Sequence, residues 1–587
     1  MRRSAFLALF LAGCAALFVL QRSQVGAPIT PRPLLYLVAD TQREAERIPL
    51  AITRVSDQDE VKIGEEIARG YGLTSKTSDD RDTAQISAYL NSVGGMLAEH
   101  VQRRGIPYHF YLDDRGSFVN AFALPGGHIV VGRGLLELIE SEDELAAILG
   151  HEIAHVDNRH AIERVQYERA SRKLGLASIY QLGAPAVEIF QAGYTKDQEL
   201  EADRAGLSLA VTAGYSAGGG INLINRFQQV ESDYTQRADS PIEEFAGLPF
   251  STLMEYFRSH PPASERRAAL QTEAFTRGWD LSQAVRPFKI RAIFLTDAAE
   301  SLDRAGNFAA SISHFKEAIN SNPDYVRARQ GLAQTSWRSG DAQGAAETAA
   351  AAIQRAATAS DWMLLARALA VSEPKDALNR FDALVKEIYL APDWSNDSYT
   401  VARVESAGLA FLRSGKNALR QYYAVLSALP QGASDQSFAR REMGWWMYRS
   451  GKLDLAASEL ETARQLMPQS QQANLRAAWV LSDLGRQADA ERLATAGAMG
   501  IQAQASPSAD QRAERQAVLA VLKWRTEQRQ AAALQFQEAA SKDPVWMVRR
   551  WVENNYSSAA AETLEHLQSL ESSRRSKEKQ QTSQLLH

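Results

Sequence analysis

The 587-residue chain contains a single cysteine, Cys14, so it can form neither an internal disulfide nor a zinc site built from several thiolates. The scarcity of cysteine does not distinguish an oxidising from a reducing compartment, because domains without thiols are stable in both. Excess positive charge is also missing: the net charge is −5, and no basic stripe with interleaved aromatic residues occurs. These absences argue against nucleic acid as a partner.

Long apolar runs are scarce as well. The one candidate extends from Ser4 to Leu20, directly after Arg2-Arg3, and its 17 residues are at the short limit for a membrane span. Three interpretations stay open: a lipoprotein signal ending at Cys14, an uncleaved single-span anchor, or an ordinary cleaved signal peptide. Each predicts a body outside the cytoplasm, and the first two predict membrane association through the N-terminus.

The segment His151-Glu152-Ile153-Ala154-His155 is the motif that carries chemistry. Residues four apart stack one turn above the other on a helix, so the two imidazoles can share one Zn²⁺ at about 2.0–2.1 Å. Glu152 then lies beside the open metal position and can take a proton from the bound water, whose pKa zinc lowers to about 7. This H-E-x-x-H pattern is typical of zinc metallopeptidases. A solvated face is the alternative, but Ser141 and the acidic residues 142–144 predict the start of a buried helix.

A catalytic zinc needs a third protein ligand, and the segment from residue 199 to residue 203 offers carboxylates. Glu199 and Asp203 face the same way on a predicted second helix, whereas Glu201 points roughly 200° away from Glu199. We therefore expect Glu199 to bind the metal and Asp203 to orient a ligand histidine. An acidic helix start without any metal is the alternative.

A short apolar segment, residues 120–131, precedes the zinc motif and is interrupted by Pro125-Gly126-Gly127. Proline and glycine inside a strand favour an edge strand or a bulge. An edge strand beside zinc can pair with an extended peptide, and Asn120, Ala121 and Phe122 are the residues we expect to do so. An ordinary hairpin is the alternative.

Together these segments resemble the zinc metallopeptidases typified by the heat-shock protease HtpX, the CAAX prenyl protease and the periplasmic protease BepA. The resemblance covers roughly residues 57–270. It rests on the strand and turn at 120–127, on the HEIAH pentapeptide, and on Glu199-Leu200-Glu201-Ala202-Asp203.

The resemblance implies one zinc ion per chain and a role for each matching residue. His260, which stands before Pro261-Pro262, resembles a loop histidine that can fill the fourth zinc position in BepA-like relatives and hold the enzyme closed. A loop histidine without metal contact is equally open for His260. The implied zinc ligands are His151, His155 and Glu199; Glu152 is the general base, and Asp203 is the partner of a ligand.

From about residue 290 the sequence becomes helical and repetitive. Gly306 recurs as Gly340, and Gly451 recurs as Gly485, each 34 residues further on. A 34-residue period with helix–turn–helix punctuation is typical of tetratricopeptide repeats, whose units stack into a solenoid. A generic helical bundle is the alternative.

The sequence thus predicts a mainly α protein, with a helical zinc-metallopeptidase domain that contains a small β element, followed by an α-solenoid of tetratricopeptide-like repeats. The last residues, including Arg574 to Lys579, are expected to form a frayed tail. The predicted segments are 1–20 (signal peptide, lipoprotein signal or anchor), 21–56 (linker), 57–285 (zinc metallopeptidase), 290–550 (repeats) and 551–587 (tail).

The predicted function is that of an exported zinc-dependent endopeptidase that hydrolyses peptide bonds of protein clients. The likeness to BepA implies a role in envelope or outer-membrane protein quality control, with the repeats binding clients or the outer-membrane assembly machinery. A chaperone or scaffold whose repeats carry the main role, with a latched protease, is the alternative. A prenyl-protein protease is disfavoured because that branch needs several membrane spans and the sequence offers one candidate.

Overall fold

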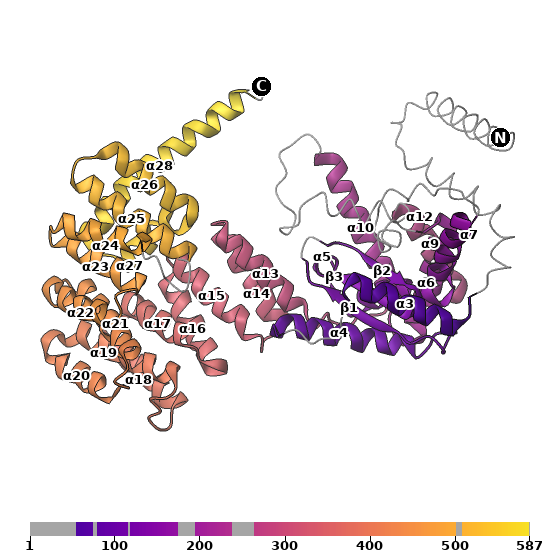
Figure 1. The fold of residues 1–587 in the computed structure, drawn as a ribbon, viewed down its shortest axis with the longest axis horizontal. Coiled ribbons are helices and arrows are strands. Elements are labelled where there is room, and N and C mark those ends of the chain that lie inside the picture. Colours follow the sequence, from indigo (N-terminus) through magenta and orange to yellow (C-terminus); the bar gives the residue numbers. More distant parts are fainter. Residues whose placement is uncertain are drawn as a thin grey trace. The chain divides into compact units, whose positions relative to one another are not determined.

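The computed structural model of the chain divides into two compact units, Met1–Phe294 and Leu295–His587, and each is described by itself (Figure 1). The predicted signal or anchor and almost all of the predicted linker fall outside the described residues, as does His260. Within those residues, no helix has both the length and the apolar character that crossing a bilayer requires. The described ranges are 55–73, 79–115, 118–173, 194–237, 263–499 and 508–585.

The first unit combines helices with one small sheet, as the sequence predicts. Its helices are α3 (Asp57–Tyr71), α4 (Arg81–Ala98), α5 (Arg133–Leu136), α6 (Glu142–Asp157), α7 (His160–Lys173), α9 (Lys196–Thr212), α10 (Ala217–Arg237) and α12 (Ala263–Arg277). Its strands are β1 (His109–Asp113), β2 (Ala121–Leu124) and β3 (His128–Gly132), with the short 3-10 helix η1 (Pro125–Gly127) between β2 and β3.

The sheet has the order β1-β3-β2, in which β1 is parallel and β2 antiparallel to β3. Gly126 and Gly127 both have positive φ, 75° and 86°, which a glycine adopts without steric cost, and they close the tight connection between β2 and β3. The segment is a hairpin, and β2 lies at the edge of the sheet that the described residues form. The pairing of an extended peptide along residues 120–131 stays a prediction.

Helix α6 carries the zinc motif through the interior of the first unit. The hydroxyl of Ser141 accepts a hydrogen bond from the Glu144 N–H at 3.2 Å, so the predicted N-cap is confirmed. Every residue from Glu142 to Val156 is buried except Ala147. A helix buried on nearly all sides must satisfy most of its polar side chains internally, and both histidines of the motif have buried polar partners.

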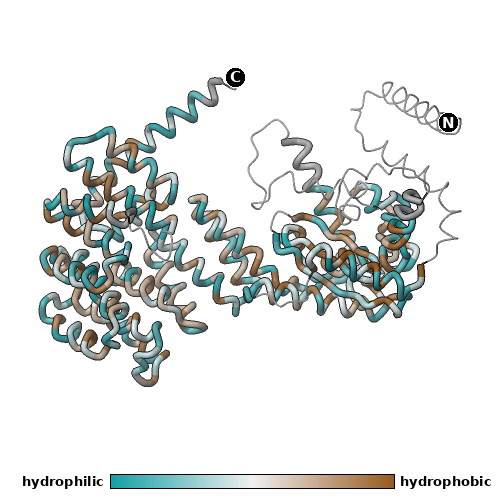
Figure 2. The backbone as a smooth tube through the Cα atoms, viewed as in Figure 1, coloured by the Kyte–Doolittle hydropathy of each residue, from teal (hydrophilic) through white to brown (hydrophobic). Residues whose placement is uncertain are grey.

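The second unit consists of helices that pack mostly against their neighbours in the sequence, and Figure 2 shows hydrophilic and hydrophobic residues interspersed along them. The α-helices are α13 (Arg291–Arg304), α14 (Phe308–Ser321), α15 (Val326–Arg338), α16 (Ala342–Ala356), α17 (Ala359–Ser372), α18 (Ala377–Ile388), α19 (Asp397–Ser414), α20 (Leu419–Ala428), α21 (Ala433–Arg449), α22 (Leu453–Leu466), α23 (Gln471–Asp483), α24 (Gln487–Met499), α25 (Ala509–Arg525), α26 (Arg529–Lys542), α27 (Arg549–Asn555) and α28 (Ser558–Leu585). The 3-10 helices are η2 (Gly415–Ala418) and η3 (Pro544–Met547).

The predicted helix–turn–helix units are present, and the repeated glycines lie at their turns. Gly306, Gly340, Gly451 and Gly485 all have positive φ, between 74° and 87°. Glu527, where the sequence repeats the spacing without a glycine, adopts the same backbone region with φ 63°. The spacing therefore identifies the turn even where the residue type does not.

The expectation of a frayed C-terminal tail needs correction. Residues 574–579 continue the 28-residue helix α28, whose first half packs through the buried side chains of Ala560, Leu564 and Leu567. Beyond that packed half, Arg574 pairs with Glu571 one turn before it. Charges at helical spacing stabilise an exposed helix end, so this segment belongs to the helical unit.

Candidate metal centre

Helices α6 and α9 approach each other so closely that only glycine fits at the crossing. A Cβ on Gly206 would lie 2.5 Å from the backbone nitrogen of His151, and a Cβ on Gly150 would lie 2.5 Å from the Gly206 carbonyl oxygen. Both distances are far below the optimal carbon contact of about 3.5–4.0 Å. The two glycines therefore set the spacing that brings the start of α9 against the zinc motif.

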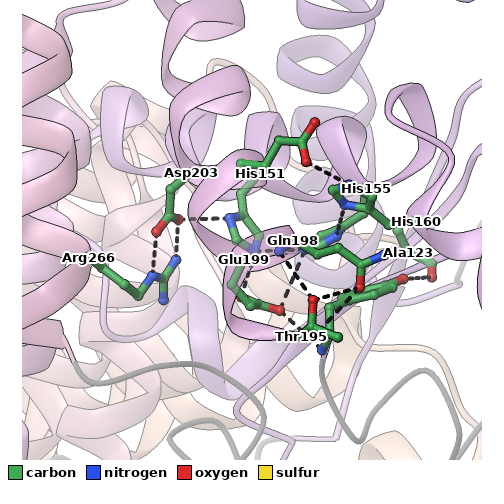
Figure 3. A network of polar contacts seen from close by, with 11 residues as sticks. Ala123, His151, His155, His160, Thr195, Gln198, Glu199, Asp203 and Arg266 are labelled. Atoms are coloured by element: carbon green, nitrogen blue, oxygen red, sulfur yellow. Dashed lines mark hydrogen bonds and ion pairs between the residues drawn. The ribbon is translucent and has the colours of Figure 1, made fainter. Parts of the chain in front are cut away.

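Three side chains converge beside this crossing, as Figure 3 shows, and their ligand atoms all lie within 4.8 Å of one another. The Nε2 atoms of His151 and His155 are 3.1 Å apart, and the carboxylate of Glu199 is 3.5 Å from the first and 3.7 Å from the second. Two ligand atoms on one tetrahedral zinc stand about 3.3–3.4 Å apart. The donor set thus fits a zinc ion in both chemistry and spacing.

A chain of buried polar groups orients His151. Its Nδ1 lies 2.9 Å from Asp203, whose carboxylate in turn accepts two hydrogen bonds from Arg266, at 2.6 and 2.8 Å. A carboxylate can only accept, so His151 must donate from Nδ1, which leaves its Nε2 lone pair for a metal. Burial alone would raise the pKa of Asp203, but Arg266 and His151 outweigh it and hold that pKa well below its usual range.

His155 is oriented by a second series of polar contacts, which no motif in the sequence reveals. Its Nδ1 lies 3.0 Å from Nδ1 of His160, and Nε2 of His160 lies 3.5 Å from the carboxylate of Glu201. One proton assignment suits all of these partners: His155 donates to His160, and His160 donates to Glu201. The Nε2 lone pair of His155 then faces the same point as that of His151. Glu201 is not part of the metal cluster, but it contacts His160, which in turn orients His155.

Glu152 lies beside the cluster with one oxygen free for chemistry. Its side chain is buried, and its Oε2 has no hydrogen-bond partner in the described structure. Burial raises the pKa of this carboxyl to about 7, against the opposing effects of His151 and of a hydrogen bond from the Ala123 backbone. A cavity of about 20 Å³, lined by Glu152, His151 and Ala121 among others, is large enough for one water molecule.

Comparison with known proteins agrees with this geometry. Residues 84–274 match peptidase family M48, and residues 296–360 match the tetratricopeptide repeat. The chain carries an M48 peptidase domain followed by tetratricopeptide repeats. The M48 match contains the entire cluster, and the repeat match covers the first hairpins of the second unit.

Several curated proteins share part of this chain. The beta-barrel assembly-enhancing protease of Yersinia pestis is 27% identical over 207 residues, which are 31% of this chain and 41% of the relative. That of Escherichia coli K12 is 31% identical over 147 residues, 22% of this chain and 30% of the relative. The metalloprotease YcaL of Escherichia coli K12 is 27% identical over 209 residues, 33% of this chain and 74% of the relative. The chain thus spans less than half the length of the first two.

Within the M48 domain the structure brings together most of the residues singled out from the sequence. His151, His155 and Glu199 form the cluster, Asp203 contacts His151 behind it, and Ala121 of β2 lines the cavity beside Glu152. Their roles as ligands, base and substrate contacts stay predictions. His260 lies outside the described residues, so its proposed place at the metal also stays a prediction.

Tyr194, which no sequence motif marks, touches three parts of the site. Its ring stacks on the imidazole of His155, with the ring centroids 3.8 Å apart and the planes 16° apart. Its hydroxyl donates to the Ala123 carbonyl of β2 at 3.2 Å, and its backbone N–H donates to Glu199 at 3.3 Å. No spacing rule connects a tyrosine ahead of α9 to a strand 71 residues earlier, so this contact emerges only in the fold.

Proposed function

We propose that this chain is a zinc-dependent endopeptidase that hydrolyses peptide bonds of protein clients. The observation that carries the proposal is the joint geometry of the cluster and its neighbour Glu152. Two histidines and Glu199 present ligand atoms within 4.8 Å of one another, and the buried Oε2 of Glu152 stands beside them without a hydrogen-bond partner among the described residues. That combination is what metal-assisted hydrolysis of an amide requires.

His151, His155 and Glu199 would hold one zinc, which when bound polarises a carbonyl and acidifies water. Side chains and backbone of the protein carry out proton transfer, substrate alignment and ligand orientation. Glu152 takes the proton of the attacking water on its free oxygen and later delivers it to the leaving amine. Strand β2 aligns an extended substrate through its open edge. Asp203 fixes His151 in the tautomer that the metal needs.

We further propose that the enzyme acts outside the cytoplasm, in the bacterial cell envelope. Two of the relatives are beta-barrel assembly-enhancing proteases, and the apolar run from Ser4 to Leu20 supports export with a lipid or a membrane span at the N-terminus. Clients would be envelope proteins that fail to assemble. The tetratricopeptide repeats would bind those clients or the outer-membrane assembly machinery, since stacked helical hairpins form extended binding surfaces.

Substitution of the general base tests the catalytic proposal. We expect Glu152→Gln to keep one zinc per chain and to lose hydrolysis of an unfolded protein by roughly 10²–10⁴-fold, the usual contribution of a positioned base. Glu99→Gln, which removes an exposed carboxylate at the end of α4, is the matched control and should change nothing. Near wild-type turnover by the Glu152→Gln protein would refute the assignment.

The alternative of a chaperone or scaffold with a latched protease is favoured by one feature of the site. The cavity beside Glu152 measures about 20 Å³, which suits a water molecule but not a peptide. If that closed state is the working one, Glu152→Gln should preserve the cellular role while abolishing cleavage, and His260→Ala should raise proteolysis. If the protease carries the role, Glu152→Gln should abolish both.

A further inference from the structure

The pairing of β2 with β3 determines which backbone N–H and C=O groups of β2 point toward the unpaired edge, where a substrate would bind. The Gly132 N–H donates to the Asn120 carbonyl at 2.8 Å, and β2 pairs with β3 in the register Ala121↔Val131. In an antiparallel pair, hydrogen-bonded and non-hydrogen-bonded positions alternate. Ala121 and Ala123 therefore direct their N–H and C=O groups away from β3, toward the open edge.

Those outward groups already have partners inside the protein. Asn120 Oδ1 accepts from the Ala121 N–H at 2.9 Å, and the Tyr194 hydroxyl donates to the Ala123 carbonyl at 3.2 Å. The Ala123 N–H faces the carboxylate of Glu152. Natural sheet edges are commonly protected from unwanted pairing, and here the protecting groups are side chains at the metal centre.

Tyr194 holds its place through contacts on three sides. The ring is stacked on His155, the backbone N–H is bonded to Glu199, and the guanidinium of Arg164 lies 5.4 Å from the ring centroid. A carbonyl oxygen has two lone pairs, but a pairing strand runs only about 4.7–4.9 Å away. The fixed phenol occupies the space in which that strand would place its own N–H donor.

We propose that Tyr194 caps the substrate-binding edge of β2, because its hydroxyl occupies the position at the Ala123 carbonyl that the backbone N–H of a bound peptide would take. The inference rests on the proposed peptidase function and extends it. A peptide that adds to the edge of β2 must displace this hydroxyl first. Tyr194 also stacks on His155 and donates to Glu199. A peptide that displaces the Tyr194 hydroxyl therefore acts on a residue that contacts two of the proposed metal ligands.

The test compares Tyr194→Phe, which keeps the stacked ring and removes only the donor, with the parent protein. Fluorescein-labelled β-casein serves as the unfolded probe, and its affinity is measured by anisotropy in full-length protein that carries Glu152→Gln to prevent cleavage. The values of kcat and KM are measured with Glu152 intact. Tyr111→Phe is the matched control, since it removes a 3.0 Å hydroxyl bond between β1 and β3 and leaves the Tyr194 contacts with Ala123, His155 and Glu199 in place.

Tyr194→Phe should tighten casein binding and lower KM by about twofold to tenfold, the worth of one hydrogen bond, and leave kcat within about twofold. Tyr111→Phe should leave both unchanged. An unaltered affinity would overturn the proposal. A loss of kcat by roughly 10²-fold in Tyr194→Phe would also overturn it, because the hydroxyl would then stabilise the transition state and not block the edge. Failure of the Tyr194→Phe protein to bind casein would overturn it too, because the freed edge is the proposed docking element.

Failure of the peptidase function would look different from failure of this proposal. A wild-type protein that binds casein but never cleaves it would contradict the proposed hydrolysis. The casein affinities with and without Tyr194→Phe are measured without cleavage. Their ratio would therefore still show whether Tyr194 competes with the peptide. Zinc content of each variant, measured alongside, shows whether the cluster has survived the substitution.

Discussion

The close contact between α6 and α9 predicts how far zinc affinity falls when a glycine at their crossing is replaced. In Gly206→Ala the new Cβ would lie 2.5 Å from the His151 nitrogen, 2.6 Å from the Gly150 carbonyl carbon and 2.7 Å from the His151 Cα. All three atoms belong to the backbone, so the helices must separate by about 1 Å to reach normal contact distances. Zinc sites tolerate errors of only about 0.2 Å in their distances. We therefore expect zinc affinity to fall by roughly 10²-fold or more.

The assay for Gly206→Ala is competition for zinc with a chromogenic chelator, together with far-UV circular dichroism. Overpacking should also cost about 1–3 kcal/mol of stability. Gly95→Ala is the matched control, since Gly95 lies within α4 and a Cβ there meets nothing within 4 Å. That change should keep zinc affinity and stabilise the helix by about 0.5–1 kcal/mol. A Gly206→Ala protein that folds and binds zinc within twofold of wild type would refute the reasoning.

Two further predictions concern the groups behind the ligands. His160→Leu should weaken zinc binding by about 10–100-fold, as loss of an orienting partner does, while His160→Gln, which can still accept from His155, should restore much of it; equal losses in both variants would contradict the relay. Arg266→Ala leaves the buried Asp203 without its cation, so it should destabilise the domain by about 3–5 kcal/mol in thermal unfolding; adding Asp203→Asn should recover part of that loss, and no recovery would contradict the pairing.

Local patterns in the sequence predicted the elements that carry the site. Ser141 and the acidic turn after it fix the start of α6, and the spacing of His151 and His155 places both imidazoles on one face. The 34-residue spacing of glycines located the repeat turns because each turn requires a backbone conformation that glycine adopts readily. These features depend on residues a few positions apart, which is the range that sequence periodicity covers.

The missed features join residues that are distant in the sequence. Arg266 reaches Asp203 across 63 residues, and Tyr194 reaches Ala123 across 71. No periodicity connects such positions, since they meet only when α9, α12 and β2 pack around α6. The glycine of α9 at the crossing was visible in the sequence, but its role depends on a partner in another helix.

The C-terminal tail was a different kind of miss, because the local information was present. Glu571, Arg574, Arg575 and Glu578 stand three and four residues apart, which is the spacing of ion pairs along a helix. Opposite charges at this spacing favour a helix, so the expectation of a frayed tail overlooked a local signal.

Zinc stoichiometry in two glutamate variants tests the central assignment most directly. Both glutamates lie in the first two turns of α9, but Glu199 is fully buried at the cluster and the Glu201 side chain is 53% exposed. The purified wild-type chain and Glu201→Ala should each contain one zinc after dialysis, and Glu199→Ala should contain none. A Glu199→Ala protein with full zinc, beside a Glu201→Ala protein without it, would contradict the account.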